Sequence, residues 1–435
     1  MSTDQEYGLG VQRDVALAAL RNADETETPL KGPQRFTSPF QTAPFDILSL
    51  IFRYCAEGDW LSSLRIACVS RHWRSTVLQT PRAWCFIGGL KRSGLPLERY
   101  YETVKPCWDI YFERSTQALL HIHLPQLISL KHFAPMAHRI QCMATHLMQG
   151  MTPDEPFTRL AYLRIMADQA CGASTHTSLI DPSLFPNLRH LEIYNTLNGI
   201  GLPELPPLET LAITAWLGEE WIALVDACKK TLTWLKILLE DNDDMERRSI
   251  RMPKLRYLEI AENTQQTLFD EPYTVTFRIN APALRVYNET AVCIPGSPIE
   301  TADLKGVTHM CQSEIPSSFP LLNLRFLRLN VPFENCFSFL EDLAQEPHVY
   351  PRLEHIELYS QGMSPSEIAS SREMLEAWDW GRIPGLTHPP SITKNDEEWS
   401  VPFPGENAVA VSDICTILVE PNLQRSVSPD VVQRN

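Results

Sequence analysis

One short pattern recurs through the second half of the chain and limits what it can fold into. The pattern is a turn, often with proline, followed by L-x-x-[LI]-x-[IL]. Its eight copies are Leu160–Ile165, Leu188–Ile193, Leu208–Ile213, Leu232–Ile237, Leu255–Ile260, Leu284–Tyr287, Leu324–Leu329 and Leu353–Leu358. Side chains alternate between the two faces of a strand, so the later aliphatic residues of each copy share one face. Stacking such strands as a parallel sheet buries what one copy cannot bury alone.

The spacing of the copies indicates the kind of array. Successive first leucines are 28, 20, 24, 23, 29, 40 and 29 residues apart, and all but one spacing lies in the range of about 20–29 typical of leucine-rich repeats. The excess of 34 prolines over 18 glycines fits units that each begin at a proline. We therefore expect an irregular leucine-rich-repeat solenoid of the α/β class over residues 157–380, with parallel strands on one face and helices or loops on the other. The longest gap indicates either an insertion around Pro295–Phe319 or a degenerate copy.

Segments between and after the copies carry apolar residues at helical spacing. They predict helices at Glu219–Lys230 and Asn335–Gln345 on the far side of the strands, and one at Ser364–Trp378 that caps the array. Residues 381–435 are expected to form a partly disordered tail with an apolar stretch at Ala408–Val419.

The stretch 44–84 predicts compact helices with more apolar surface than so short a segment can bury. In its first helix one apolar stripe consists of Phe45, Leu48, Ile51, Phe52 and Cys55, and a second of Ile47, Leu50 and Tyr54. A helix with two apolar stripes is either buried on most sides or docked onto another protein. Asp59 is expected to cap a second helix whose apolar residues are Leu61, Leu64, Ile66 and Val69.

Residues 41–86 resemble an F-box. The segments that carry the resemblance are Ala43-Pro44-Phe45-Asp46-Ile47-Leu48, Ile51-Phe52, Asp59-Trp60-Leu61, Val69-Ser70-Arg71-His72-Trp73-Arg74 and Thr80-Pro81-Arg82-Ala83-Trp84. The chain departs from the family pattern in three places. Ala43 stands where leucine is usual, Asp46 replaces glutamate, and Trp60 separates the aspartate from the leucine of the D-L pair.

An F-box followed by leucine-rich repeats is similar to the arrangement in fungal F-box proteins. The resemblance implies a three-helix module and a substrate-recognition subunit of an SCF-type (Skp–cullin–F-box) ubiquitin ligase, which reaches the cullin through a Skp-type adaptor. It implies adaptor contacts by Pro44, Ile47, Leu48, Ile51, Leu61, Val69 and Trp73. Some of these residues must instead belong to the core of the module, foremost Trp73, together with Trp84.

The overall composition argues against several partners. A net charge of −15 over 435 residues disfavours nucleic acid or an anionic membrane as the main partner, because both require a basic face. The eleven cysteines form no C-x-x-C pair and suit reduced thiols in the cytoplasm or nucleus. We find no apolar leader and no membrane-spanning stretch, so an intracellular protein is expected.

The remaining segments predict less regular structure. Residues 1–40 are expected to be flexible, with a weakly amphipathic helix at Val11–Ala23. Residues 87–156 form a transition with the first degenerate repeats. Within it, the alternation of Ala118–Pro125 predicts a strand ended by its proline, and Pro135–Met148 carries apolar residues at helical spacing.

No constellation for catalysis is visible in the sequence. His121 and His123 share a strand face, and Cys142 lies near His146, but no carboxylate or cysteine cluster completes a metal site. Phosphate loops and nucleophile motifs are absent, and the acidic run 240–244 lacks the spacing of a calcium loop. We therefore expect a protein that is not an enzyme and needs no metal or cofactor.

The outward positions of the predicted strands offer a surface instead. Rings at these positions resemble interface anchors, since they bury much area at a low entropic cost. The residues expected to bind an unknown protein substrate are Tyr162, Arg164, His190, Trp234, Lys236, Tyr257, Phe326, Arg328 and His355. The alternative is a repeat scaffold without a ubiquitin role, in which residues 44–84 cap the open end of the solenoid.

Overall fold

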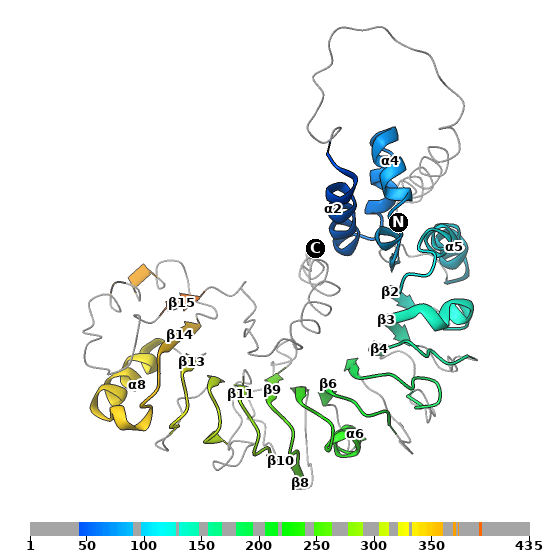
Figure 1. Cartoon of the computed structure of the whole chain (residues 1–435). Coiled ribbons are helices and arrows are strands. Elements are labelled where there is room, and N and C mark those ends of the chain that lie inside the picture. Colours follow the sequence, from blue (N-terminus) through cyan, green and yellow to red (C-terminus); the bar gives the residue numbers. More distant parts are fainter. Residues whose placement is uncertain are drawn as a thin grey trace, which may run out of the picture. The chain divides into compact units, whose positions relative to one another are not determined.

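The computed structural model describes residues 43–89, 97–127, 130–147, 155–167, 180–194, 205–215, 220–239, 248–262, 277–289, 304–312, 321–329, 333–359, 369–370, 373 and 391–393. Within these residues the protein is α/β and contains a long series of parallel strands (Figure 1). The chain divides into two compact units. Of the described residues, those within 43–127 and 132–146 belong to unit 1, and those at 130–131 and within 147–393 belong to unit 2.

Helices open the described part of unit 1. They are α2 (Phe45–Gly58), α3 (Ser62–Ala67), α4 (Arg71–Leu78) and the 3-10 helix η3 (Pro81–Trp84). α2 begins directly after Pro44, whose carbonyl accepts a hydrogen bond from the Leu48 N–H at 3.1 Å. α4 is capped by Ser70, whose hydroxyl accepts from the Trp73 N–H at 3.1 Å, an arrangement that satisfies one donor at the helix start.

One face of α2 supplies the core of this helical module. Leu48, Phe52 and Ala56 are buried, and their spacing of four residues places them on the same side of the helix. The Phe52 ring packs against the half-buried Trp73 with centroids 5.2 Å apart. Trp84 is fully buried and its indole N–H donates to the Val77 carbonyl at 2.8 Å. Both tryptophans thus pack against other parts of the module.

Unit 1 continues with β1 (Phe86–Gly88), α5 (Leu97–Arg114), β2 (Leu120–Leu127), η4 (Leu130–Arg139) and β3 (Ile140–Leu147). β1 pairs with β2 and β2 with β3, both in parallel. The strand predicted at 118–125 forms, but its proline does not end it. The register shifts between Leu124 and Leu127, which lets the strand continue past Pro125.

The helical spacing over residues 135–148 wrongly predicted a helix where β3 forms. The sequence also gave no prediction of α5. From Ile140 onward the chain is a strand, and Cys142, Met143 and Ala144 are all buried. A strand buried on both faces loses the polar alternation that would identify it. α5 contains Pro106, a residue that normally disfavours a helix interior.

Ten parallel strands of unit 2 follow one another in sequence order. They are β4 (Tyr162–Ala167), β5 (His190–Tyr194), β6 (Thr210–Ala215), β7 (Trp234–Leu239), β9 (Tyr257–Glu262), β11 (Val286–Glu289), β12 (His309–Gln312), β13 (Phe326–Leu329), β14 (His355–Tyr359) and β15 (Ser391–Thr393). All eight predicted copies form strands. Their inward leucines, such as Leu191, Leu235 and Leu258, are fully buried.

Proline occupies the second position in four of the turns that precede the strands. The turns Phe185–Leu188, Met252–Leu255, Ala281–Leu284 and Tyr350–Leu353 each have proline second. In each turn the leucine N–H donates to the carbonyl three residues earlier, at 2.9–3.3 Å. The fixed φ of proline suits this turn position, so each unit starts from a preset geometry.

The longest gap in the repeat contains a degenerate copy. The Val307 N–H donates to the Leu304 carbonyl at 3.0 Å, which reproduces the turn of the other units without proline. β12 follows and pairs in register with β11 and β13. Of the two alternatives for this gap, the degenerate copy is confirmed. Valine replaces the first leucine and methionine the second, so the L-x-x-L signature is lost.

Other elements lie beside the strands. α6 (Glu220–Cys228) and α8 (Phe333–Gln345) form where helices were predicted, followed by the 3-10 helix η5 (Pro347–Val349). β8 (Arg248–Arg251) and β10 (Phe277–Asn280) form a separate parallel pair that was not predicted. The expected helices at 11–23 and 364–378 and the apolar stretch 408–419 lie wholly or almost wholly outside the described residues. None of the described helices combines the length and apolar character needed to cross a bilayer.

Candidate functional site

The side of α2 that faces away from the core is apolar and exposed. Phe45, Ile47, Leu50, Ile51 and Tyr54 of α2 are 43%, 52%, 48%, 38% and 63% exposed, and Val69 is 60% exposed. We call these six residues the docking face. Elsewhere in the described chain the only large apolar side chain with comparable exposure is Leu322, at 51%. A cluster of this kind is typical of a protein–protein interface, whereas a single exposed leucine is ordinary.

The structure divides the residues expected to contact an adaptor. Pro44, Ile47, Ile51 and Val69 are exposed, and Leu61 and Trp73 are half-buried. The adaptor contact expected for Leu48 is wrong. Leu48 is fully buried, as is Phe52, and cannot reach a partner while the module is folded. Phe45, Leu50 and Tyr54 join the docking face without having been predicted as contacts. The two apolar stripes on this helix were the sequence signal that could have identified these three residues as exposed.

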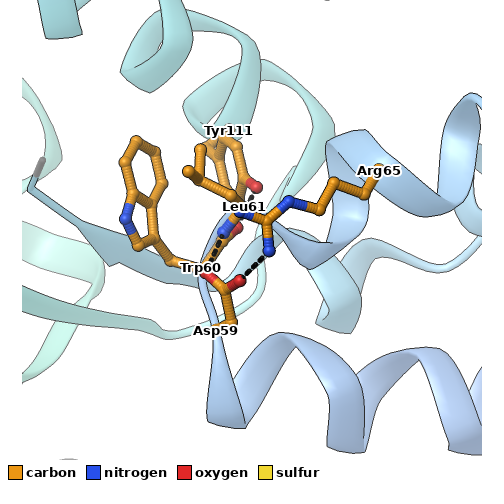
Figure 2. Close-up of polar contacts among 5 residues, drawn as sticks. All are labelled: Asp59, Trp60, Leu61, Arg65 and Tyr111. Atoms are coloured by element: carbon orange, nitrogen blue, oxygen red, sulfur yellow. Dashed lines mark hydrogen bonds and ion pairs between the residues drawn. The ribbon is translucent and has the colours of Figure 1, made fainter. Parts of the chain in front are cut away.

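Asp59 organises the turn that follows α2 (Figure 2). Its Oδ1 accepts from the Leu61 N–H at 3.0 Å, and its Oδ2 forms an ion pair with Arg65. α3 starts at Ser62 with Leu61 at the N-cap position and without a side-chain cap bond. Asp59 therefore caps the preceding turn instead of the helix, which corrects the expected N-cap.

Trp60, one departure from the family pattern, connects the module to the rest of unit 1. Its carbonyl accepts a hydrogen bond from the Tyr111 hydroxyl, and the two rings lie 5.7 Å apart (Figure 2). Burial raises the pKa of Tyr111 well above its usual value, so this hydroxyl remains a donor. The Trp60 indole also lies against Gly88 of β1, where a Cβ would overlap it. The Gly88 carbonyl in turn accepts from the Trp108 indole at 2.9 Å.

In unit 2 the outward positions of the strands form two rows in register. The ring row contains Tyr162, His190, Thr210, Trp234, Tyr257, Val286, His309, Phe326 and His355. The charged row contains Arg164, Glu192, Ala212, Lys236, Glu259, Asn288, Cys311, Arg328 and Glu357. Together these rows are the strand face.

Rings of the ring row stack on their neighbours. Trp234 and Tyr257 lie 5.2 Å apart with an interplanar angle of 13°. Phe326 lies between His309, at 5.9 Å, and His355, at 4.8 Å, with angles of 24° and 19°. Adjacent parallel strands are about 4.8 Å apart, so rings at equivalent positions stack without adjusting the backbone.

Opposite charges of the charged row pair across neighbouring strands. Arg164 Nε lies 3.6 Å from Glu192 Oε2, Lys236 Nζ lies 2.8 Å from Glu259 Oε1, and Arg328 Nε lies 2.9 Å from Glu357 Oε2. The Arg328–Glu357 pair is also the most enclosed, with side-chain exposures of 8% and 9%. The row therefore carries alternating charges that are already compensated.

The strand face is less accessible than the sequence suggested. Of the residues expected to bind a substrate, His190, Trp234, Lys236, Phe326 and His355 are half-buried. The others, Tyr162, Arg164, Tyr257 and Arg328, are buried. Exposed rings were expected at Tyr162 and Tyr257, and that expectation is wrong because parallel neighbours cover the sides of each ring. Their role in binding stays a prediction.

The histidines and cysteines that the structure describes do not converge on a metal site. Across the residues that the structure covers, no group of three His, Cys, Asp or Glu side chains is arranged to hold an ion. His121 and Cys142 are in register on β2 and β3. Burial, reinforced by Arg53, lowers the pKa of His121 to about 4, and burial raises the pKa of Cys142 to about 12. Both groups are therefore neutral at physiological pH.

Comparison with known proteins adds no identification. The sequence matches no protein-family model, and a search of curated proteins finds no match.

Proposed function

We propose that the protein is a substrate-recognition subunit of an SCF-type ubiquitin ligase. The docking face would bind a Skp-type adaptor and, through it, the cullin, while the strand face holds a protein substrate. The observation that carries the proposal is the docking face, because four of its residues, Ile47, Leu50, Ile51 and Tyr54, lie on the side of α2 opposite the buried Leu48, Phe52 and Ala56. All six docking-face residues lie within residues 43–84, the stretch that resembles an F-box.

The physical mode would be a helix whose apolar side lies in a groove of the adaptor. Ile47, Leu50, Ile51 and Tyr54 follow the spacing of anchors in this mode. Removing them from water would contribute about 25 cal/mol for each Å² of apolar surface. The core residues Leu48 and Phe52 would hold the helix in place.

The repeat units support the second half of the proposal. We infer that they are leucine-rich repeats, because large buried apolar side chains, most of them leucine, recur in register from β4 to β14. Ubiquitin transfer would need no catalytic group in this chain. Holding a target beside the ligase raises the effective concentration of its lysines.

The competing function is a repeat scaffold without a ubiquitin role. On that hypothesis the helical module only covers the end of the strand array. It is favoured by the Trp60–Tyr111 and Trp60–Gly88 contacts, which join the module to α5 and β1 within one unit. The scaffold hypothesis does not explain why the apolar residues of the docking face are exposed.

Two matched leucines provide the test. Leu50 on the docking face and Leu322 in unit 2 have almost equal exposure, 48% and 51%. The full-length protein is co-purified with a Skp-type adaptor as wild type, Leu50→Glu and Leu322→Glu, and thermal unfolding is followed by circular dichroism. We expect Leu50→Glu to weaken the complex at least 30-fold, or about 2 kcal/mol, without lowering Tm. Leu322→Glu should leave both unchanged.

Either of two results would overturn the proposal. Absence of a complex with the wild-type protein would leave the scaffold as the better function. Equal loss of binding in both leucine variants would show that the docking face is not the contact.

A further inference from the structure

Exposed cations gather at the turns that lead into β9, β11 and β12 and at the neighbouring strands β8 and β10. The segments 251–256, 278–285 and 304–308 contain no acidic residue, although the whole chain has a net charge of −15. Their exposed basic residues, which we call the basic edge, are Arg251, Lys254, Arg256, Arg278, Arg285 and Lys305. At physiological ionic strength, charges more than about 8 Å away are largely screened, so a partner at these turns meets a positive surface.

The hydrogen bonds between neighbouring turns place the basic edge on one continuous surface. The Arg285 N–H donates to the Arg256 carbonyl, and the Thr308 N–H donates to the Arg285 carbonyl, both at 2.8 Å. The Met252 N–H donates to the Asn280 carbonyl at 2.8 Å, which links the turn before β9 to the turn before β11. Consecutive turns therefore lie about one strand spacing, or 4.8 Å, apart.

The pair of strands β8 and β10 adds two cations to this surface. Ile250 and Ile279 are in register on these strands, and both are buried. Side chains alternate along a strand, so Arg251 and Arg278 share the opposite face, which is exposed.

No carboxylate of a described residue forms an ion pair with any cation of the basic edge. Arg285 donates to the Gly306 carbonyl at 2.9 Å, and this neutral acceptor does not compensate its charge. In the turn before β13, by contrast, Arg325 is held by Glu354 through bonds of 2.9 and 2.7 Å. The basic edge thus differs from the charged row of the strand face, where each cation has a carboxylate beside it.

An exposed leucine lies next to one end of the basic edge. Leu322, 51% exposed, is second in the turn that leads into β13, and Lys305 holds the equivalent position in the preceding turn. The Asn323 Nδ2 donates to the Lys305 carbonyl at 2.8 Å and so joins the two turns. One exposed leucine is ordinary by itself, but beside this row of cations it offers an apolar anchor.

The surroundings favour an acidic protein segment over a nucleic acid. Proteins that hold single-stranded nucleic acid stack its bases on exposed rings, and none of the exposed residues described in unit 2 is Phe, Tyr or Trp. The net charge of −15 also opposes the approach of a long polyanion. Carboxylates on a short extended segment, at about 3.3 Å per residue, would instead meet cations on successive turns.

We propose that the basic edge binds an extended acidic segment of a partner protein. Asp or Glu side chains of the segment pair with the cations, and an apolar side chain of the segment packs on Leu322. The inference goes beyond the proposed function, because it requires no adaptor at the docking face.

The test uses defined peptides and the full-length protein. One labelled synthetic peptide has six glutamates with a leucine at each end, and its control has glutamines in place of the glutamates. Affinities are measured by fluorescence anisotropy at low and at physiological salt. We expect the glutamate peptide to bind at least tenfold more tightly than the glutamine peptide and to weaken as salt rises, because exposed charges are screened. Single-stranded oligothymidylate of the same charge should bind more weakly than the glutamate peptide.

Two matched charge reversals locate the contact. Lys254 and Arg159 are both exposed and both third in the turn that leads into their strand, β9 and β4 respectively. Lys254→Glu and Arg159→Glu change the total charge equally, so only the local effect differs. Lys254→Glu should weaken the glutamate peptide about fivefold, and Arg159→Glu should not change its affinity. Neither variant should lower Tm, since both side chains are exposed.

The two exposed leucines separate this inference from the proposed function. Leu322→Glu should weaken the glutamate peptide at least tenfold and retain the adaptor. Leu50→Glu should retain the peptide and lose the adaptor. Failure of one proposal is therefore distinguishable from failure of the other.

Several outcomes would overturn the inference. They are equal affinity for the glutamate and glutamine peptides, tighter binding of oligothymidylate, full peptide affinity in Leu322→Glu, and equal losses in Lys254→Glu and Arg159→Glu. The triple variant Asp241→Asn/Asp243→Asn/Asp244→Asn tests the chain's own acidic run, which precedes β8 in the sequence. At least tenfold tighter binding of the glutamate peptide by this variant would also overturn the inference, because the acidic run would then be the occupant of the basic edge.

Discussion

Helix α2 and the strand face are both rich in apolar and aromatic side chains, but they differ in what those side chains contact. On α2, Ile47, Leu50 and Tyr54 are about half exposed. On the strand face Trp234 stacks on Tyr257, which is only 7% exposed. A short helix in a small module has a core on one side only, whereas parallel strands give every outward side chain a neighbour at about 4.8 Å.

The comparison shows that exposure, more than composition, separates the two surfaces. Burying the docking face in a partner would remove apolar area from water, so it fits an interface driven by the hydrophobic effect. The strand face has its rings stacked and its charges paired before any ligand arrives. Its described rings and charges therefore offer less free apolar area to a partner than the docking face does.

The largest expected effect tests the two sides of α2. Leu48→Ala should lower the free energy of unfolding by about 4 kcal/mol, because it empties a fully buried site. Ile47→Ala, one residue away and 52% exposed, should change it by less than about 0.5 kcal/mol. Urea unfolding of both variants is the measurement. Similar losses would mean that the docking face is part of the core.

The next prediction compares two arginines on or beside β13. Arg328→Ala should cost about 3 kcal/mol, because it leaves Glu357 buried without its cation. Arg325→Ala removes the exposed pair with Glu354, whose contacts are 2.9 and 2.7 Å, and should leave Tm unchanged. Thermal unfolding decides. Equal changes of Tm in the two variants would show that the Arg328–Glu357 pair is as solvated as the exposed Arg325–Glu354 pair.

Gly88→Ala examines the attachment of the helical module to the strands of unit 1. The added Cβ would overlap the Trp60 indole, and the resulting displacement should cost about 2 kcal/mol. Loss of the near-UV circular dichroism of the tryptophans below the main unfolding temperature would report local release of Trp60. If the spectrum and stability of Gly88→Ala match those of the wild type, the Trp60 indole does not pack closely against Gly88.

A smaller effect concerns pH. The pKa of His121 is lowered to about 4 from 6.5 by burial and by Arg53, so the folded protein keeps this ring neutral. Below pH 6.5 the unfolded chain takes up a proton that the folded chain does not, and stability should fall as the pH drops toward 4, by about 1.8 kcal/mol between pH 7 and pH 5. In the wild type the His121 and Phe86 ring centroids are 4.9 Å apart. His121→Phe keeps a ring at this position and should reduce the dependence of stability on pH. The measurement is urea unfolding of the wild type and His121→Phe at pH 7 and pH 5. Equal losses of unfolding free energy between the two pH values would contradict the assignment to His121.

Much of the fold was predictable because its signals are local. The repeated leucines and proline turns predict the strands of unit 2, and the buried leucines of β5, β7 and β9 confirm them. β12 was not predicted because Val307 and Met310 replace the leucines of the pattern, although their burial is the same. β3 was misread because both of its faces are buried, which removes the alternation of a strand.

The docking face was only half predictable. Helical spacing identifies two apolar stripes on α2, but spacing alone does not tell which stripe meets the core. Leu48 was therefore assigned to a partner that it does not face, and Leu50 was left out. Trp60 was visible as an insertion, yet its contacts with Tyr111 and Gly88 join residues 51 and 28 positions apart in the chain.

The sequence by itself determined the period of the repeat, the parallel arrangement that this period requires, and the surplus of apolar surface on α2. These properties follow from side-chain periodicity and turn chemistry, which act over a few residues. Only the tertiary structure decided which side of α2 is exposed and which charges of the strand face are paired. Burial and pairing depend on neighbours that are distant in the chain, such as Arg328 and Glu357, 29 residues apart.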